Sequence, residues 1–224
     1  MLWRWFVLAT FGEVVGFMGP AVVGVLTASW PGAAALPALI IAGAVEGTLL
    51  GWAQARAVRH LLPRLRARRF VAGTALAASW AYLIGMTPSS LGDRLASLPV
   101  ALVVLGGGVA AVLLLGSIGT AQWLELRRCL PASASWIVAT AGAWAVGLGV
   151  FAAVAMPLWQ EGWSPGLVVA IGILGGVVMA ATVALLTSLA LRRLLSRAGM
   201  LGVPMSVLSP SRTGTSGDPV ARGT

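Results

Sequence analysis

Apolar residues fill most of the chain and are interrupted only at short intervals by charged or turn-forming residues. No charged residue occurs within residues 14–45, 70–92, 95–124, 129–160 or 162–191. A helix that spans a bilayer needs about 20 mostly apolar residues, so each stretch is long enough. The turn-forming segment 29–32 divides the first stretch between two helices. The pattern predicts six transmembrane helices, over about residues 5–27, 36–57, 70–86, 99–124, 135–156 and 166–191.

The composition agrees with a membrane protein and excludes an ordinary soluble domain. Apolar residues make up 58% of the chain and charged residues 9%, against about 45–50% and about 25% in soluble proteins. We therefore expect an all-α integral membrane protein with one membrane domain over residues 1–198. Residues 199–224 are rich in Ser, Thr, Gly and Pro, and are predicted to form a disordered cytoplasmic tail.

The basic residues, all of them arginine, are concentrated in alternate connections between the predicted helices. The chain has 15 of them against 6 acidic residues, which gives a formal net charge of +9. Because cytoplasmic loops carry an excess of basic residues, both termini are predicted to be cytoplasmic, in a bacterial inner membrane. The arginines expected to set this topology and to attract anionic lipid head groups are Arg56, Arg59, Arg64, Arg66, Arg68, Arg69, Arg127, Arg128, Arg192 and Arg193.

Most tryptophans fall near the predicted helix ends, as in the aromatic belts of membrane proteins. The cytoplasmic interface is expected to hold Trp3, Trp5, Trp52, Trp123 and Trp136. The outer interface is expected to hold Trp30, Trp80, Trp159 and Trp163. Trp144 is the exception, because it lies in the middle of a predicted helix.

The ends of the second and fourth predicted helices resemble each other, which indicates an internal repeat. Gln54 and Gln122 are 68 residues apart, and each is followed nine residues later by a proline. Trp5 and Trp136 open the first and fifth helices, 131 residues apart, or about twice that spacing. We predict three repeated helical hairpins, over about residues 1–62, 63–131 and 132–198. Hairpins that enter the membrane in the same orientation are related by an axis along the membrane normal.

The segment GTAQWLELRR, residues 119–128, is followed by a tryptophan-led helix that opens SWIVAT at residue 135. Here the chain resembles a group of uncharacterised bacterial multi-pass membrane proteins with recurring G-x-x-Q-W-x-x-L-R helix-end segments. The resemblance is clearest over about residues 115–150. The first hairpin has Ala55 in place of the motif's Trp, and the third hairpin lacks the Gln. The resemblance implies a membrane location and no particular activity.

Glycines recur at intervals of four residues in three of the predicted helices. This spacing places them on one helix face, where the absence of a side chain lets two helices approach closely. Helix packing is therefore the role predicted for Gly12, Gly16, Gly43, Gly47, Gly51, Gly172 and Gly176.

Two acidic residues, Glu13 and Glu46, lie inside predicted transmembrane helices. A charge at a helix centre costs about 2.5–3.5 kcal/mol on insertion, so such residues normally face the protein interior. Glu13 is about 12 Å from Trp5 along its helix, and Glu46 is about 15 Å from Arg56. The two acids are thus expected at similar depth on adjacent helices, either as a proton, cation or substrate site or as a hydrogen bond that locks the helices together. Gln54 and Gln122 complete the candidate intramembrane polar site, where they would cross-link helices or line a vestibule.

Residue types that carry most enzymatic chemistry are scarce. The chain has one Cys, Cys129, and one His, His60, and it has no Lys. We expect no catalytic group, cofactor or metal, and therefore no enzyme. The arginines lie between apolar runs instead of on a soluble basic face, which argues against nucleic acid as a partner.

Two functions remain open at this point. The first is a non-catalytic structural or accessory membrane component, which contacts the bilayer and either a membrane-complex partner or further copies of itself. The alternative is a small transporter or channel for a proton, a cation or a small solute, which uses the Glu13 and Glu46 pair. A dry, closed bundle interior would argue against the alternative.

Overall fold

A computed structural model of the chain describes residues 2–158, 160 and 162–200, and all of its described secondary structure is helical. The helices are α1 (Leu2–Leu26), α2 (Gly32–Val58), α3 (Ala67–Ala96), α4 (Val100–Leu126), α5 (Ser135–Leu158) and α6 (Pro165–Arg197). All six are long and apolar enough to cross a membrane, so the prediction of a six-span multi-pass membrane protein is confirmed. Trp159 and Glu161 lie outside the described residues, as does the predicted tail from residue 201 onward.

The helix boundaries follow local chemistry. Pro31 and Pro99 stand immediately before α2 and α4, where a missing backbone N–H costs nothing. The Ser164 side chain caps α6 by accepting a hydrogen bond from the Leu167 backbone N–H, at 3.4 Å. In α3 the helix turns at Gly92, whose φ of 27° is accessible to glycine at little steric cost. The helix α1 continues through Pro20 to Leu26.

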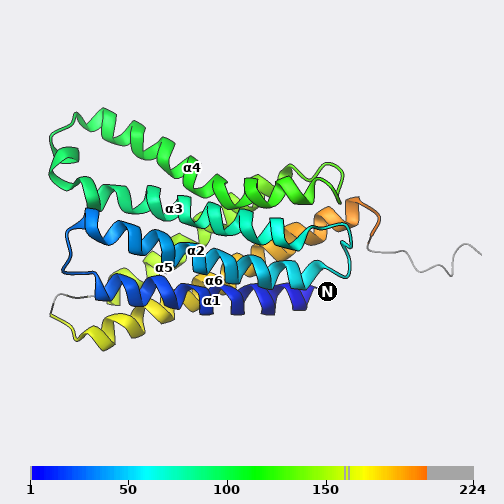
Figure 1. The fold of residues 1–224 in the computed structure, drawn as a ribbon, viewed down its shortest axis with the longest axis horizontal. Helices are drawn as coiled ribbons and strands as arrows, with labels where there is room; N and C mark the ends of the chain where they lie inside the picture. Colours follow the sequence, from blue (N-terminus) through cyan, green and yellow to red (C-terminus); the bar gives the residue numbers. More distant parts are fainter. Residues whose placement is uncertain (1, 159, 161, 201–224) are drawn as a thin grey trace, which may run out of the picture.

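The six helices form a closed ring. Each helix contacts the helices before and after it in the chain, and α1 closes the ring by packing against α6. Among the described residues no two other helices come into contact. Short connections make consecutive helices antiparallel, as Figure 1 shows. The ring therefore has an interior to which every helix contributes one face.

The two ends of the bundle differ in charge and in packing. One end, called the arginine-rich end below, holds the start of α1, the α2–α3 and α4–α5 connections and the end of α6 (Figure 1). The largest cluster of buried apolar side chains lies there and draws residues from all six helices. Toward the opposite end, α4 is exposed at Val100, Val104 and Val112. Tight packing is thus concentrated at the arginine-rich end.

Two of the tryptophans expected at the interface are core residues instead. Trp5 is 2% exposed and Trp136 is 0% exposed, and their rings pack edge to face with centroids 5.8 Å apart. The interfacial prediction for these two was wrong, because the faces of α1 and α5 that carry them turn into the ring. Trp3 and Trp52 are exposed, as a belt position requires.

Candidate functional site

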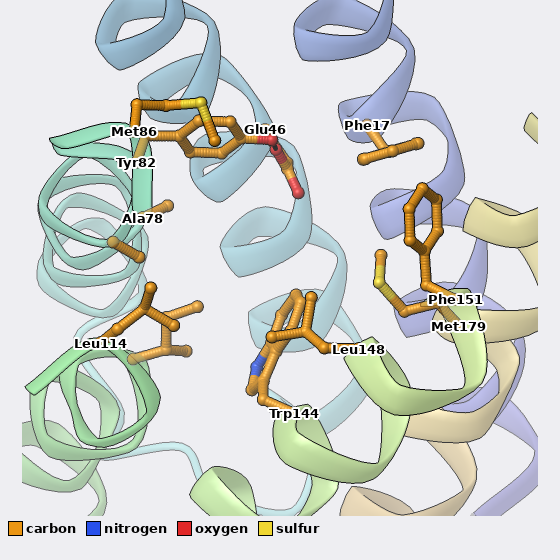
Figure 2. A pocket seen from close by; sticks show the side chains of 12 residues that line it. Phe17, Glu46, Ala78, Tyr82, Met86, Leu114, Trp144, Leu148, Phe151 and Met179 are labelled. Carbon is orange, nitrogen blue, oxygen red and sulfur yellow. Dashed lines mark hydrogen bonds between the residues drawn. The ribbon is translucent and has the colours of Figure 1, made fainter. Parts of the chain in front are cut away.

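The interior of the ring contains a cavity of about 220 Å³. Its walls come from every helix, and Figure 2 shows the side chains that face it. Four of them are aromatic: Phe17 of α1, Tyr82 of α3, and Trp144 and Phe151 of α5. Aliphatic and methionine side chains supply most of the remaining wall, including Leu114 of α4 and Met179 of α6.

Glu46 of α2 is the one carboxyl group among the residues that line this cavity. It is 6% exposed, and its Oε2 accepts a hydrogen bond from the Tyr82 hydroxyl at 2.7 Å. Figure 2 shows the carboxyl group and the phenol ring meeting at the cavity wall. No basic side chain lines the cavity. The site therefore offers one acidic group within an aromatic and apolar enclosure.

Glu13 of α1 lies behind Glu46. It is 2% exposed, and neither of its carboxyl oxygens has a hydrogen-bond partner among the described residues. Gly16, one turn further along α1, leaves room for the other acid, since a Cβ there would approach the Glu46 Cγ to 3.2 Å. The two carboxyl groups are close enough to interact directly, so the structure brings together the acids that the sequence places at similar depth.

Two buried carboxyl groups at this distance require compensation. Like charges in an apolar interior repel each other, and burying an unpaired carboxylate is costly. The described arginines are all exposed, at one end of the bundle or the other, so none of them neutralises the pair. The arrangement is suited to holding a shared proton or one cation between the two groups.

A layer of buried hydrogen bonds closes the arginine-rich end of the cavity. The Gln122 side-chain amide donates to Gln54 Oε1 at 2.7 Å and to Thr74 Oγ1 at 3.3 Å. The Trp136 indole N–H donates to Gln122 Oε1 at 3.1 Å. These four side chains come from α2, α3, α4 and α5, and each is at most 3% exposed. Gln54 and Gln122 thus cross-link helices.

The remaining two helices join the same layer through a tryptophan. The Trp5 indole N–H donates to Thr187 Oγ1 of α6 at 3.1 Å, and the Trp5 ring packs against the Trp136 ring. On every helix the layer residue lies nearer to the arginine-rich end than the cavity residues do. We call these six residues the polar layer: Trp5, Gln54, Thr74, Gln122, Trp136 and Thr187.

The cavity continues toward the opposite end. A second hollow, between α1, α2 and α3, shares Phe17, Tyr82 and Met86 with the cavity wall. It extends to Trp30 and Ser89 near the ends of these helices. The two spaces are therefore adjacent across three shared side chains, and both lie on the same side of the polar layer.

Six of the seven glycines predicted to pack helices lie against a neighbouring helix. A Cβ on Gly12 would approach the Ala53 Cβ to 2.6 Å, and one on Gly47 would approach the Ala78 Cβ to the same distance. The other glycine contacts are Gly16 with Glu46, Gly43 with Tyr82, Gly51 with Thr74 and Gly176 with Phe17. Gly172 has no neighbour within 4 Å of its Cβ position, so in α6 Gly175 and Gly176 make the contacts instead.

The ten arginines expected to set topology are all exposed, and all belong to the arginine-rich end. Two of them also make defined contacts. The Arg128 Nε lies 3.5 Å from Glu125 Oε1, and the Arg127 guanidinium lies 5.0 Å from the centre of the Trp123 ring. The remaining guanidinium groups are free to meet lipid head groups at this end.

Sequence reasoning did not identify several residues of the site. Tyr82 is the single tyrosine of the chain, and Trp144 is the tryptophan that lies mid-helix. Those two peculiarities were the available signals, because neither residue belongs to a spaced motif. Phe17 and Phe151 carry no such signal. Comparisons with protein families, with curated proteins and with solved structures find no match for this chain.

Proposed function

We propose that the protein is a membrane transporter for a small solute, with the central cavity as its binding site and Glu46 as its charged group. The observation that carries this proposal is a cavity lined by all six helices around a buried carboxyl group. Intramembrane acids are functional candidates by default. A purely structural bundle gains nothing from an internal cavity, because unfilled space costs packing energy.

The contrast between the two ends of the bundle supports the same proposal. A transporter exposes its site to one side of the membrane at a time, and such sites lie near the bilayer midplane. Here the polar layer closes the arginine-rich end, whereas the hollow beside Tyr82 and Met86 adjoins the cavity on the other side. With the arginine-rich end in the cytoplasm of a bacterium, the described arrangement would open outward.

The three-hairpin repeat and the resemblance to bacterial multi-pass proteins are part of the proposal. Glu46, Leu114 and Met179 are spaced 68 and 65 residues apart, and all three line the cavity. The bond from Trp136 to Gln122 has a counterpart from Trp5 to Thr187, in which the donors are 131 residues apart and the acceptors 65. Contacts that recur at the repeat spacing support a pseudo-threefold bundle in which only the first hairpin carries the acids.

Cysteine accessibility tests the proposal without knowledge of the solute. In a Cys129→Ser background, Ala81→Cys places a thiol in the cavity wall and Ala184→Cys places one in the core at the arginine-rich end. A charged, membrane-impermeant methanethiosulfonate reagent, added from the outer side of right-side-out vesicles, should modify the first thiol and leave the second intact. A folded Ala81→Cys variant that resists the reagent from both sides would refute the transporter.

An accessory or self-associating membrane subunit is the second candidate. It is favoured by α4, the least buried of the six spans, whose face near the opposite end packs against nothing in this chain. Mild extraction from native membranes, followed by native-size analysis and identification of co-migrating proteins, tests it. A stoichiometric partner would support the accessory role, and neither candidate requires catalytic chemistry.

A further inference from the structure

We infer that the solute is a small organic cation with apolar substituents, which is held by Glu46 and enclosed by aromatic rings. This inference rests on the proposed function, because it concerns the same cavity. Its first basis is charge. The wall contains one carboxyl group and no basic side chain, so an anionic solute would meet no compensating charge.

The second basis is the chemistry of the remaining wall. A cation over an aromatic face is attracted by the ring quadrupole, and the attraction grows when water is excluded. Tyr82, Trp144 and Phe17 come from three different helices and face the same space as Glu46. Carbonyl, amide and hydroxyl groups that would replace the hydration shell of a bare metal ion are nearly absent from this wall. An alkylated ammonium ion, which carries its charge on an apolar surface, fits both features.

The third basis is size. The cavity of about 220 Å³ is smaller than the roughly 300–1,000 Å³ typical of sites for drug-sized ligands. It suits a compact ammonium ion instead of an extended amphiphile. Tyr82 is placed to assist, because its hydroxyl already fixes one oxygen of Glu46 at 2.7 Å and so orients the carboxyl group at the wall.

The experiment measures binding to the purified, full-length protein in detergent. The probe is tetraethylammonium, compared with choline, with 3,3-dimethylbutan-1-ol as the neutral analogue of choline, and with sodium chloride at matched ionic strength. We expect saturable binding of both organic cations, at least tenfold weaker binding of the neutral analogue, and no competition by sodium.

Three variants locate the site. Glu46→Gln keeps the shape of the side chain and should lower cation affinity at least tenfold. Trp144→Leu keeps an apolar wall and should weaken binding about threefold to tenfold, the range expected when one cation–aromatic contact is lost. Tyr82→Phe keeps the ring, removes the hydrogen bond to Glu46, and serves as the milder variant if Glu46→Gln fails to fold.

The outcomes separate the inference from the function beneath it. Equal binding of choline and its neutral analogue, unaffected by Glu46→Gln, would overturn the cation assignment in favour of a neutral apolar solute. Absence of binding by every probe, with the Ala81→Cys thiol still reachable from one side, would also overturn it and leave the transporter in place. A thiol unreachable from both sides would remove the proposed function together with the inference.

Discussion

The side-chain amide of Gln122 donates a hydrogen bond to the side-chain oxygen of Gln54 across 2.7 Å, although the two residues are 68 positions apart. Both are buried, and both lie at the centre of the polar layer. A polar contact at this depth connects α2 and α4, which are not neighbours in the ring. The same pair therefore ties the ring together across its interior and closes the cavity on one side.

Removing Gln122 should destabilise the bundle markedly. Gln122→Leu deprives the Trp136 indole N–H and the Gln54 side chain of a partner within the core. Each buried polar group left unpaired costs about 1–3 kcal/mol. We expect a clear loss of thermal stability in detergent, measured by the loss of monodisperse protein after heating. Thr120→Ala, an exposed position two residues away, is the control and should change little.

Adding one methyl group at Gly47 should disrupt the contact between α2 and α3. A Cβ there would approach the Thr74 carbonyl oxygen to 2.7 Å, so the helices must separate. Overpacking of this kind typically costs about 1–3 kcal/mol. Gly172→Ala is the matched control in α6, because its Cβ would enter open space and alanine is the better helix former by about 1 kcal/mol. Equal stability of the two variants would contradict the observed packing.

Cation binding should weaken as the pH falls. A proton and a cation compete for the same carboxyl pair, so the affinity for tetraethylammonium decreases when protons are abundant. The titratable groups that face Glu46 are Glu13 from α1 and Tyr82 from α3, and the parts of α4, α5 and α6 that line the cavity supply none. Calorimetry in buffers of different ionisation enthalpy should detect proton release on binding. Glu13→Gln should reduce that release, and an unchanged proton count would contradict a shared proton.

The native Cys129 thiol should report the orientation of the protein. It lies in the α4–α5 connection at the arginine-rich end, and it is the single cysteine of the chain. We expect an impermeant maleimide to label it in inverted membrane vesicles and to leave it unlabelled in intact cells. Cys129→Ser is the control for background labelling. Labelling in intact cells alone would place the arginine-rich end outside and reverse the proposed topology.

The rate of that labelling should be slow at neutral pH. Burial and the carboxylate of Glu125 raise the pKa of the Cys129 thiol above its ordinary value, against the opposing effect of Arg64 and Arg128. Only the thiolate reacts with a maleimide, so a raised pKa lowers the reactive fraction at neutral pH. The pH–rate profile in inverted vesicles should therefore be displaced to higher pH than that of a free cysteine. Glu125→Gln should move it back toward the ordinary range.

Hydropathy along the chain was sufficient to predict six spans, because a bilayer accepts only helices whose backbone groups are internally paired. The boundaries at Pro31, Pro99 and Pro165 were also readable, since proline acts locally. Spacing alone placed Glu13 and Glu46 at similar depth, because a helix advances a constant distance per residue. The glycine faces were readable for the same reason, apart from Gly172.

Which side chains face the interior of the ring was decided only by tertiary structure. Nearly every helix here is apolar all round, so its sequence does not mark an inward face, and Trp5 and Trp136 could be assigned to the interface as easily as to the core. The closing contact between α1 and α6 fixes the rotation of each helix. That rotation brings Tyr82 to Glu46, joins Gln54 to Gln122, and gathers aromatic residues from distant parts of the chain around one cavity. The sequence determined the helices and their depths, and the packing of the ring decided which side chains make up the site.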